Sequence, residues 1–148
     1  MTMNSDEKLL DEGIVTIRMD SLLEYWDPIA DNVWGCGLIT DEEIRNYSGP
    51  LRYAPAKQNS AEFFDREFNI ARIAYLLNNG WDAAEGDIEP VTLDVGLRGY
   101  TPAELIVDGN HRVAAAKLRG DETITVAIIG DVNKAIAVFV EGVYIDDY

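Results

Sequence analysis

The residues best suited to chemistry lie together in one short segment, Asp108–Arg112, with the order Asp-Gly-Asn-His-Arg. An apolar run precedes it and three alanines follow Val113, so the pattern predicts a strand, a glycine turn and the first turn of a helix. Free amides at a helix N-terminus and the helix dipole attract anions, especially phosphate. Gly109 lets the backbone approach such an anion closely because it has no Cβ. The segment therefore predicts a phosphate-binding site.

Each polar side chain of the segment has a candidate role. Arg112 offers a planar, permanently charged fork for phosphate, and the Gly109 and Asn110 amides would face the same anion. His111 is a second donor and the candidate catalytic residue, since imidazole exchanges protons near neutral pH. Asp108 is a candidate ligand for Mg²⁺ through a water molecule. Two structural roles stay open beside these: a hydrogen-bonding His111 at the helix start, and an Asp108 that only forms the turn.

The elements that would position this segment follow from periodicity and from glycine and proline signals. The fold class expected is α+β, with a small mixed β-sheet and packed helices. The main helices are expected at residues 61–79 and 111–119, and a shorter one after Asp20 or Ser21 as its cap. A further helical turn is expected within residues 40–47. Strands are expected at residues 13–18, 90–95, 103–107 and 123–129, with 135–140 as a candidate fifth strand.

The helix expected at residues 61–79 carries the strongest amphipathic pattern. Ser60 is its expected N-cap and Asn79-Gly80 its expected stop. Two sets of residues define its faces. An apolar face is expected from Phe64, Phe68, Ala71 and Tyr75, widened by Ile70, Ile73 and Leu77, and a solvated, ion-paired face from Glu62, Asp65, Arg66, Glu67 and Arg72.

Composition limits the class of protein. A chain of 148 residues with 47% apolar residues predicts one globular domain over residues 1–148. One cysteine and one histidine exclude an internal disulfide framework and the usual Cys/His zinc sites within one chain. Neither a signal-peptide pattern nor an apolar run of membrane-spanning length is present, so we expect a soluble, cytoplasmic protein.

The net charge of −15 is unevenly distributed. Residues 1–43 carry eleven acids against Lys8 and Arg18, whereas residues 109–120 carry four basic side chains and no acid. The overall charge disfavours broad nucleic-acid binding and anionic membrane surfaces. The acids could serve solubility alone or form a surface for a basic protein partner.

The segment Asp108–Ala116 resembles the signature of the ParB/sulfiredoxin-like superfamily, in its ParB-like "DGNHR" branch. The resemblance covers residues 60–131 and leaves residues 1–59 as a divergent acidic part. It implies a nucleotide-phosphate site at Gly109, Asn110, His111 and Arg112, with Mg²⁺ accompanying a nucleoside triphosphate. A nucleotide hydrolase, a phosphotransferase and a metal-dependent nuclease are the activities that such a site would allow.

Two departures from that superfamily limit the inference. Asn110 stands where sulfiredoxins have their nucleophilic cysteine, and Cys36 lies outside the matching region. No basic DNA-reading helix of the kind found in partition proteins is recognisable. The residues therefore leave open whether the protein is an enzyme. The alternative is a non-catalytic acidic binding protein, of the inhibitor, immunity or nucleic-acid-mimic type and of plasmid or phage origin, acting on a basic partner protein.

Overall fold

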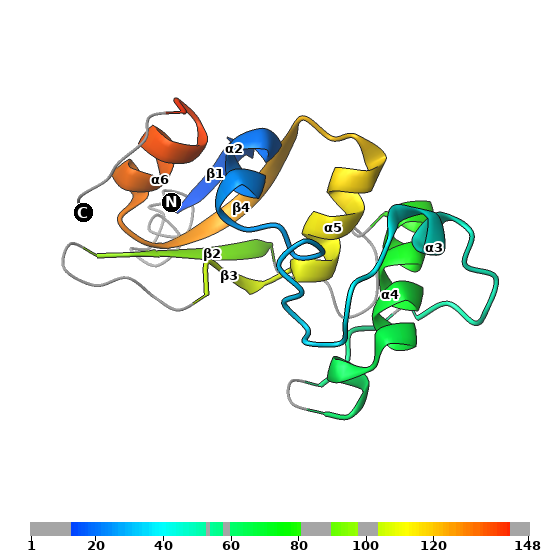
Figure 1. Ribbon diagram of the computed structural model, residues 1–148. Coiled ribbons are helices and arrows are strands. Elements are labelled where there is room, and N and C mark those ends of the chain that lie inside the picture. The colour runs from blue at the N-terminus through cyan, green and yellow to red at the C-terminus, as the bar shows by residue number, and fades with distance from the viewer. Residues whose placement is uncertain (1–12, 53, 58–59, 81–89, 98–103, 143–148) are drawn as a thin grey trace, which may run out of the picture. The chain divides into compact units, whose positions relative to one another are not determined.

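The computed structural model describes residues 13–52, 54–57, 60–80, 90–97 and 104–142. They form an α+β structure with a four-stranded mixed sheet and five α-helices (Figure 1). This confirms the expected fold class at that level. The chain divides into two compact units, one built from Met1–Trp26, Pro90–Gly109 and Glu122–Tyr148 and the other from Asp27–Glu89 and Asn110–Asp121.

The first unit contains the sheet, in the strand order β1-β4-β2-β3. The edge strand β1 (Ile14–Arg18) runs antiparallel to β4 (Thr123–Gly130). In the middle of the sheet, β4 pairs in parallel with β2 (Val91–Gly96), and β2 pairs antiparallel with the short β3 (Ile106–Asp108). All four strands overlap the segments expected from the sequence.

Register places apolar residues of all four strands on one face. Ile17 pairs with Ile124, Val91 with Val126 and Leu93 with Ile106, and all six side chains are buried. On the opposite face, Thr16 and Thr125 share a hydrogen bond of 2.8 Å between their exposed hydroxyl groups. This alternation of apolar and polar faces is the period-two pattern of a half-buried sheet.

Two helices complete the first unit. Helix α2 (Met19–Tyr25) follows β1 directly, and α6 (Val132–Phe139) packs against α2 and the sheet (Figure 1). The rings of Tyr25 and Phe139 meet edge to face, with centroids 5.7 Å apart. The expected caps of α2 were wrong, because its N-cap is Arg18 and makes no side-chain cap bond, while Asp20 instead binds Arg18 and accepts from the Ser21 amide.

Helix α6 replaces the candidate fifth strand expected at residues 135–140, so that prediction was wrong. The Asp131 carboxylate caps the helix by accepting a hydrogen bond from the Lys134 amide at 3.2 Å. Ala135, Val138 and Phe139 are buried at helical spacing. The apolar run is therefore one face of a short helix, and its N-terminal cap lies outside the run itself.

The second unit is helical. It contains α3 (Asp41–Arg45), the 3₁₀ turn η1 (Glu62–Phe64), α4 (Arg66–Asn79) and α5 (Asn110–Arg119). Helices α4 and α5 lie side by side and contribute most of the core of this unit (Figure 1). The core residues are Ile29, Trp34, Ile39, Ile44, Ile70, Ile73, Ala74, Leu76, Ala114, Ala115 and Leu118.

Helix α4 begins later than the sequence predicts. Ser60 does accept a hydrogen bond from the Phe63 amide, but this bond initiates only η1. Asp65 then caps α4 by accepting from the Phe68 amide at 3.0 Å. Phe64, expected on the apolar face, is 51% exposed because it belongs to the 3₁₀ turn and not to the helix. Gly80 ends α4 at a positive φ of 74°, as expected.

Within the described residues, no helix combines the length and the apolar character needed to cross a bilayer.

Candidate functional site

The junction between β3 and α5 has the expected form. The strand ends at Asp108, the helix begins at Asn110, and Gly109 lies between them with a φ of +111°. A Cβ at Gly109 would lie 2.8 Å from Val91 Cγ2, closer than carbon atoms approach in folded proteins. Glycine is therefore required here by both backbone conformation and space.

His111 is held by a side chain of α4. Its Nε2 lies 2.7 Å from Asn69 Oδ1, and Asn69 is fully buried. Asn69 Nδ2 donates to the Phe63 carbonyl at 3.2 Å, which fixes the amide so that Oδ1 faces the histidine. Because Oδ1 can only accept, Nε2 carries the proton and Nδ1 of the neutral ring keeps its lone pair.

Two residues from the segment before α3 also contact His111 or its partner Asn69. The Trp34 ring stacks on the His111 ring, with centroids 4.5 Å apart and an angle of 17° between the planes. Trp34 is 2% exposed, so its ring is a buried contact of His111 and not a surface on which a ligand could stack. Cys36 lies next to Asn69, whose Nδ2 also approaches Sγ at 3.6 Å. The imidazole is thus fixed in orientation on several sides.

Two arginines are buried beside His111. Arg112 is 2% exposed and Arg72, from α4, is 1% exposed. Arg72 Nη1 donates to the Arg52 carbonyl at 3.3 Å. Both arginines make further interactions, and among the described residues neither buried Nε–H group has a hydrogen-bond acceptor.

Burial has the largest influence on the ionisable groups of this cluster. Burial, followed by the positive charges of Arg72 and Arg112, lowers the pKa of His111 to about 3. Burial, followed by repulsion from Arg112, also lowers the pKa of Arg72 to about 10, against a smaller opposite influence of Tyr75. At neutral pH the histidine is therefore neutral, and two neighbouring guanidinium groups carry the charge.

Sequence reasoning missed Asn69 and misplaced Arg72. Arg72 was expected on a solvated, ion-paired face, and the expected exposure was wrong because Arg72 is 1% exposed on a helix that packs against α5. A signal was available: Asn69 and Arg72 are the two polar residues within the otherwise apolar or aromatic stretch 68–77. A helix that is apolar nearly all round is a buried helix, so its few polar residues are buried with it.

The other predicted site residues are placed as follows. Asn110 opens α5 and is partly buried, as is Gly109 before it. Asp108 is exposed at the end of β3. Over the described ranges, no group of three or more histidine, cysteine or acidic side chains is arranged to hold a metal ion. The magnesium role of Asp108 stays a prediction.

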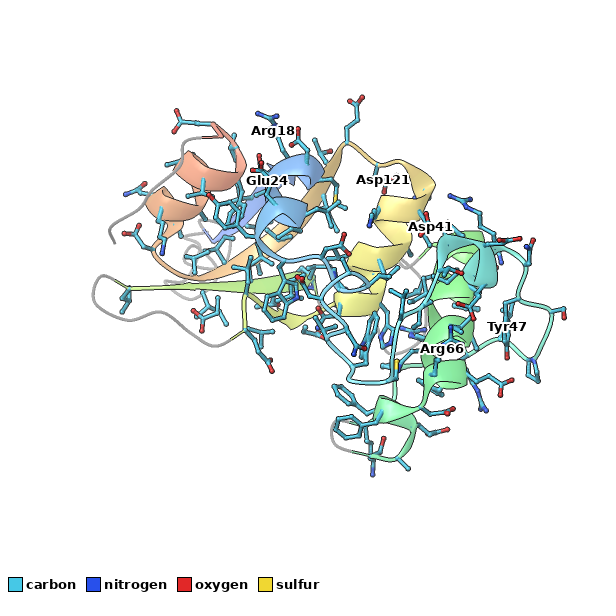
Figure 2. The ribbon with its side chains drawn as sticks, in the orientation of Figure 1. Arg18, Glu24, Asp41, Tyr47, Arg66 and Asp121 are labelled. Carbon is cyan, nitrogen blue, oxygen red and sulfur yellow. The ribbon has the colours of Figure 1, made fainter. Side chains whose placement is uncertain are left out.

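Several acids of the N-terminal third bind basic residues of their own unit. Asp27 pairs with Lys117 at 2.7 Å, and Glu43 pairs with Arg66 at the start of α4 (Figure 2). The Arg66 bond holds the pKa of Glu43 below its usual range. At the far end of α5, Arg119 pairs with Asp121 (Figure 2). The charges of Lys117 and Arg119, in the basic segment 109–120, are thus balanced by nearby acids. The remaining acids at residues 1–12 lie outside the described residues.

Comparison of the chain with protein-family models, curated proteins and solved structures found no match.

Proposed function

We propose that this chain binds the phosphate of a nucleotide at the first turn of α5, with Asn110, His111 and Arg112 as ligands and Gly109 as the residue that precedes them. Within this proposal the chain is a ParB/sulfiredoxin-like protein, as its signature segment implies. The resemblance implies Arg112 and His111 as site residues, and the electrostatic influence of the buried Arg72 on His111 adds a second cation near them.

The observation that carries the proposal is the burial of two guanidinium groups next to one imidazole. The positive charges of both arginines lower the pKa of His111, and that of Arg112 lowers the pKa of Arg72. A bound anion would act in the opposite direction and favour the charged forms. Phosphate fits because its oxygens match the planar fork of arginine and the free amides at a helix start.

Catalysis would use the same groups. Phosphoryl transfer requires mainly positioning and charge stabilisation, which the two arginines would supply to a nucleotide hydrolase or phosphotransferase. His111 Nδ1 would be the proton acceptor, and Mg²⁺ held through Asp108 would be the expected metal. A metal-dependent nuclease would need the same cluster to accept a phosphodiester, against the net charge of −15.

The experiment is a calorimetric titration with ATP, ADP, CTP and GTP, with and without Mg²⁺. Charge-assisted hydrogen bonds contribute about 1.5–3 kcal/mol each, so Arg112→Ala should weaken binding by about tenfold to a hundredfold. Arg112→Lys should recover part of the loss, because an ammonium group cannot form the bidentate contact. Arg119→Ala is the matched control, since it removes the same charge from the same helix at an exposed ion pair.

Because Arg112 is buried, its variants need a check on folding. Arg112→Met keeps an unbranched apolar stem in place of the aliphatic part of the side chain and removes the charge, and thermal melts of each variant report its stability. If the wild type binds none of the nucleotides, or if folded Arg112→Met binds as tightly as the wild type, the phosphate site is refuted.

A non-catalytic acidic binding protein is the second candidate, favoured by the exposed carboxylates of Asp41 and Glu42 in the first turn of α3. Such a protein would bind a basic partner through these acids and would be indifferent to Arg112. The calorimetric series distinguishes the two functions, because only the phosphate site depends on the first turn of α5.

A further inference from the structure

The two edge strands of the described sheet differ in how well they could accept another strand. Strand β3 has three residues, its pairing with β2 shifts register between Thr92 and Leu93, and it ends at the exposed Asp108. Short length, irregular register and charge keep a sheet edge from pairing with another chain. Strand β1 has five residues, pairs with β4 without a shift and contains no proline. Its one charged residue, Arg18, lies at its end and binds Asp20.

The register of β1 shows which of its backbone groups point away from β4. The Ile128 N–H donates to the Gly13 carbonyl at 2.7 Å, and the Met19 N–H donates to the Glu122 carbonyl at 2.9 Å. Residues that bond to the neighbouring strand alternate with residues whose groups face the other way. The groups facing outward are therefore the N–H and C=O of Ile14 and of Thr16, and the N–H of Arg18. No element of the described sheet pairs with this side of β1.

The unit that contains β1 is acidic. Its described residues include eight acids and two bases. Three exposed acids belong to the end of β1. Asp20 hydrogen bonds to Arg18, and the charge of Glu24 adds to that of Asp20 in raising the pKa of Arg18. Glu122 lies opposite Met19, where the strand ends. Figure 2 shows Arg18 and Glu24 together at this end of the unit. Three carboxylates thus accompany one guanidinium group.

We propose that the outer edge of β1 is a docking site for an extended, basic segment of a partner protein, which adds to the sheet as a further strand beside Ile14–Arg18. Main-chain hydrogen bonds to the outward groups hold the segment, and its lysine or arginine side chains face the carboxylates of Asp20, Glu24 and Glu122. A second copy of this chain fits less well, because it would bring the same carboxylates and a net charge of −15 to the edge. Neither α3 nor α5 takes part, so the inference goes beyond both functions proposed above.

The test is amide hydrogen exchange of the full chain, followed by NMR, with a peptide of alternating lysine and valine as the probe. Without peptide, the outward amides of Ile14, Thr16 and Arg18 should exchange fast, while those of Val15 and Ile17, which bond to β4, should exchange slowly. Saturating peptide should slow the outward amides by at least about tenfold. A peptide of alternating glutamate and valine should not slow them, because its charges repel those of the unit.

Thr16→Pro provides the variant. Proline removes the outward N–H at a position where edge strands tolerate it, so the pairing with β4 should persist. Thr16→Val is the matched control, because both variants lose the hydroxyl bond to Thr125 but valine keeps the amide. The lysine peptide should slow the remaining outward amides in Thr16→Val and not in Thr16→Pro. Slow exchange of the amides that bond to β4 reports that each variant keeps the strand, and the comparison of the two peptides on the wild type decides the proposal without any variant.

The other outcomes would overturn the proposal at different points. Slow exchange of the outward amides in the free protein at every concentration would show that the chain itself covers this edge. Slowing that grows with protein concentration, without peptide, would assign the edge to a second copy. Binding of the lysine peptide that leaves the outward amides fast would place it on another surface, and equal protection by the glutamate peptide would refute the charge argument. None of these results bears on the nucleotide titration, which tests a different unit.

Discussion

Replacing the one histidine should change how the stability of this protein depends on pH. The perturbation is His111→Gln, which keeps a side-chain N–H for Asn69 Oδ1 but does not titrate. In the folded wild type, burial and two neighbouring arginines lower the pKa of His111 to about 3, whereas the unfolded chain has the ordinary value of about 6.5.

The direction and the size follow from proton linkage. Between about pH 6.5 and pH 3 the unfolded state binds more protons than the folded state, so the free energy of unfolding falls as the pH falls. Each unit costs about 1.4 kcal/mol, and the loss between about pH 7.5 and pH 5 should be about 2 kcal/mol from this residue. The contribution is fully present above about pH 7.

The assay is urea denaturation of both proteins at about pH 7.5 and pH 5, in buffers free of sulfate and phosphate. Carboxylates that titrate in this range act equally on both proteins, so the difference between their pH dependences isolates the histidine. His111→Gln should lose about 2 kcal/mol less than the wild type over this interval. Equal pH dependences, within about 0.5 kcal/mol, would refute the view of His111 as a neutral, charge-repelled group.

Three further predictions concern the elements that carry the site and the acidic surface. Gly109→Ala should destabilise the protein by about 2–5 kcal/mol, about 1–2 from the left-handed conformation and about 1–3 from the contact with Val91; an unchanged urea midpoint would contradict this. Asp131→Ala removes the cap of α6 and should cost about 1 kcal/mol in the same assay, whereas no change would mean that the cap does not support the helix. If the acidic surface binds basic proteins, its affinity for polylysine should fall steeply between about 0.05 and 0.5 M salt, because charges are screened within about 10 Å at 0.1 M. Affinity that does not change with salt, or with neutralisation of the two exposed acids Asp41 and Glu42, would exclude that role.

The junction that begins the site was predictable because its signals are local. Gly109 separates a β-branched run, which is typical of a strand, from an alanine-rich run, which is typical of a helix. The structure accordingly confirms the strand, the turn and the helix, although the strand begins three residues later than expected, at Ile106. The strands β1, β2 and β4 were predictable for the same reason.

Helix α6 shows where local signals are ambiguous. Six consecutive apolar residues fit a buried strand and one side of a short helix equally well. The choice depends on Asp131, four residues before the run, whose carboxylate caps the first turn. A length of eight residues gives too few turns for periodicity to decide.

The buried part of the site depends on tertiary packing, which the sequence pattern does not state. Arg72 follows Arg66 on the same helix, yet Arg66 binds Glu43 at the surface and Arg72 is buried. What separates them is the position of α5, which covers one side of α4. Asn69 was not predicted as a site residue, because a single asparagine in an apolar helix does not reveal its hydrogen-bond partner. That partner, His111, is known only from the structure.

The sheet also imposes a delay on the chain during its synthesis. Strand β1 has β4 as its sheet neighbour, and the hydroxyl groups of Thr16 and Thr125 that meet across this pair are 109 residues apart in sequence. At about 5–20 residues per second, the ribosome needs about 5 to 20 s to make the intervening chain. Throughout that time a β-branched strand has both of its hydrogen-bonding edges unpaired, a state in which strands of neighbouring chains readily associate. Chaperone dependence during translation, rather than low final stability, is therefore the first weakness to expect of variants in β1.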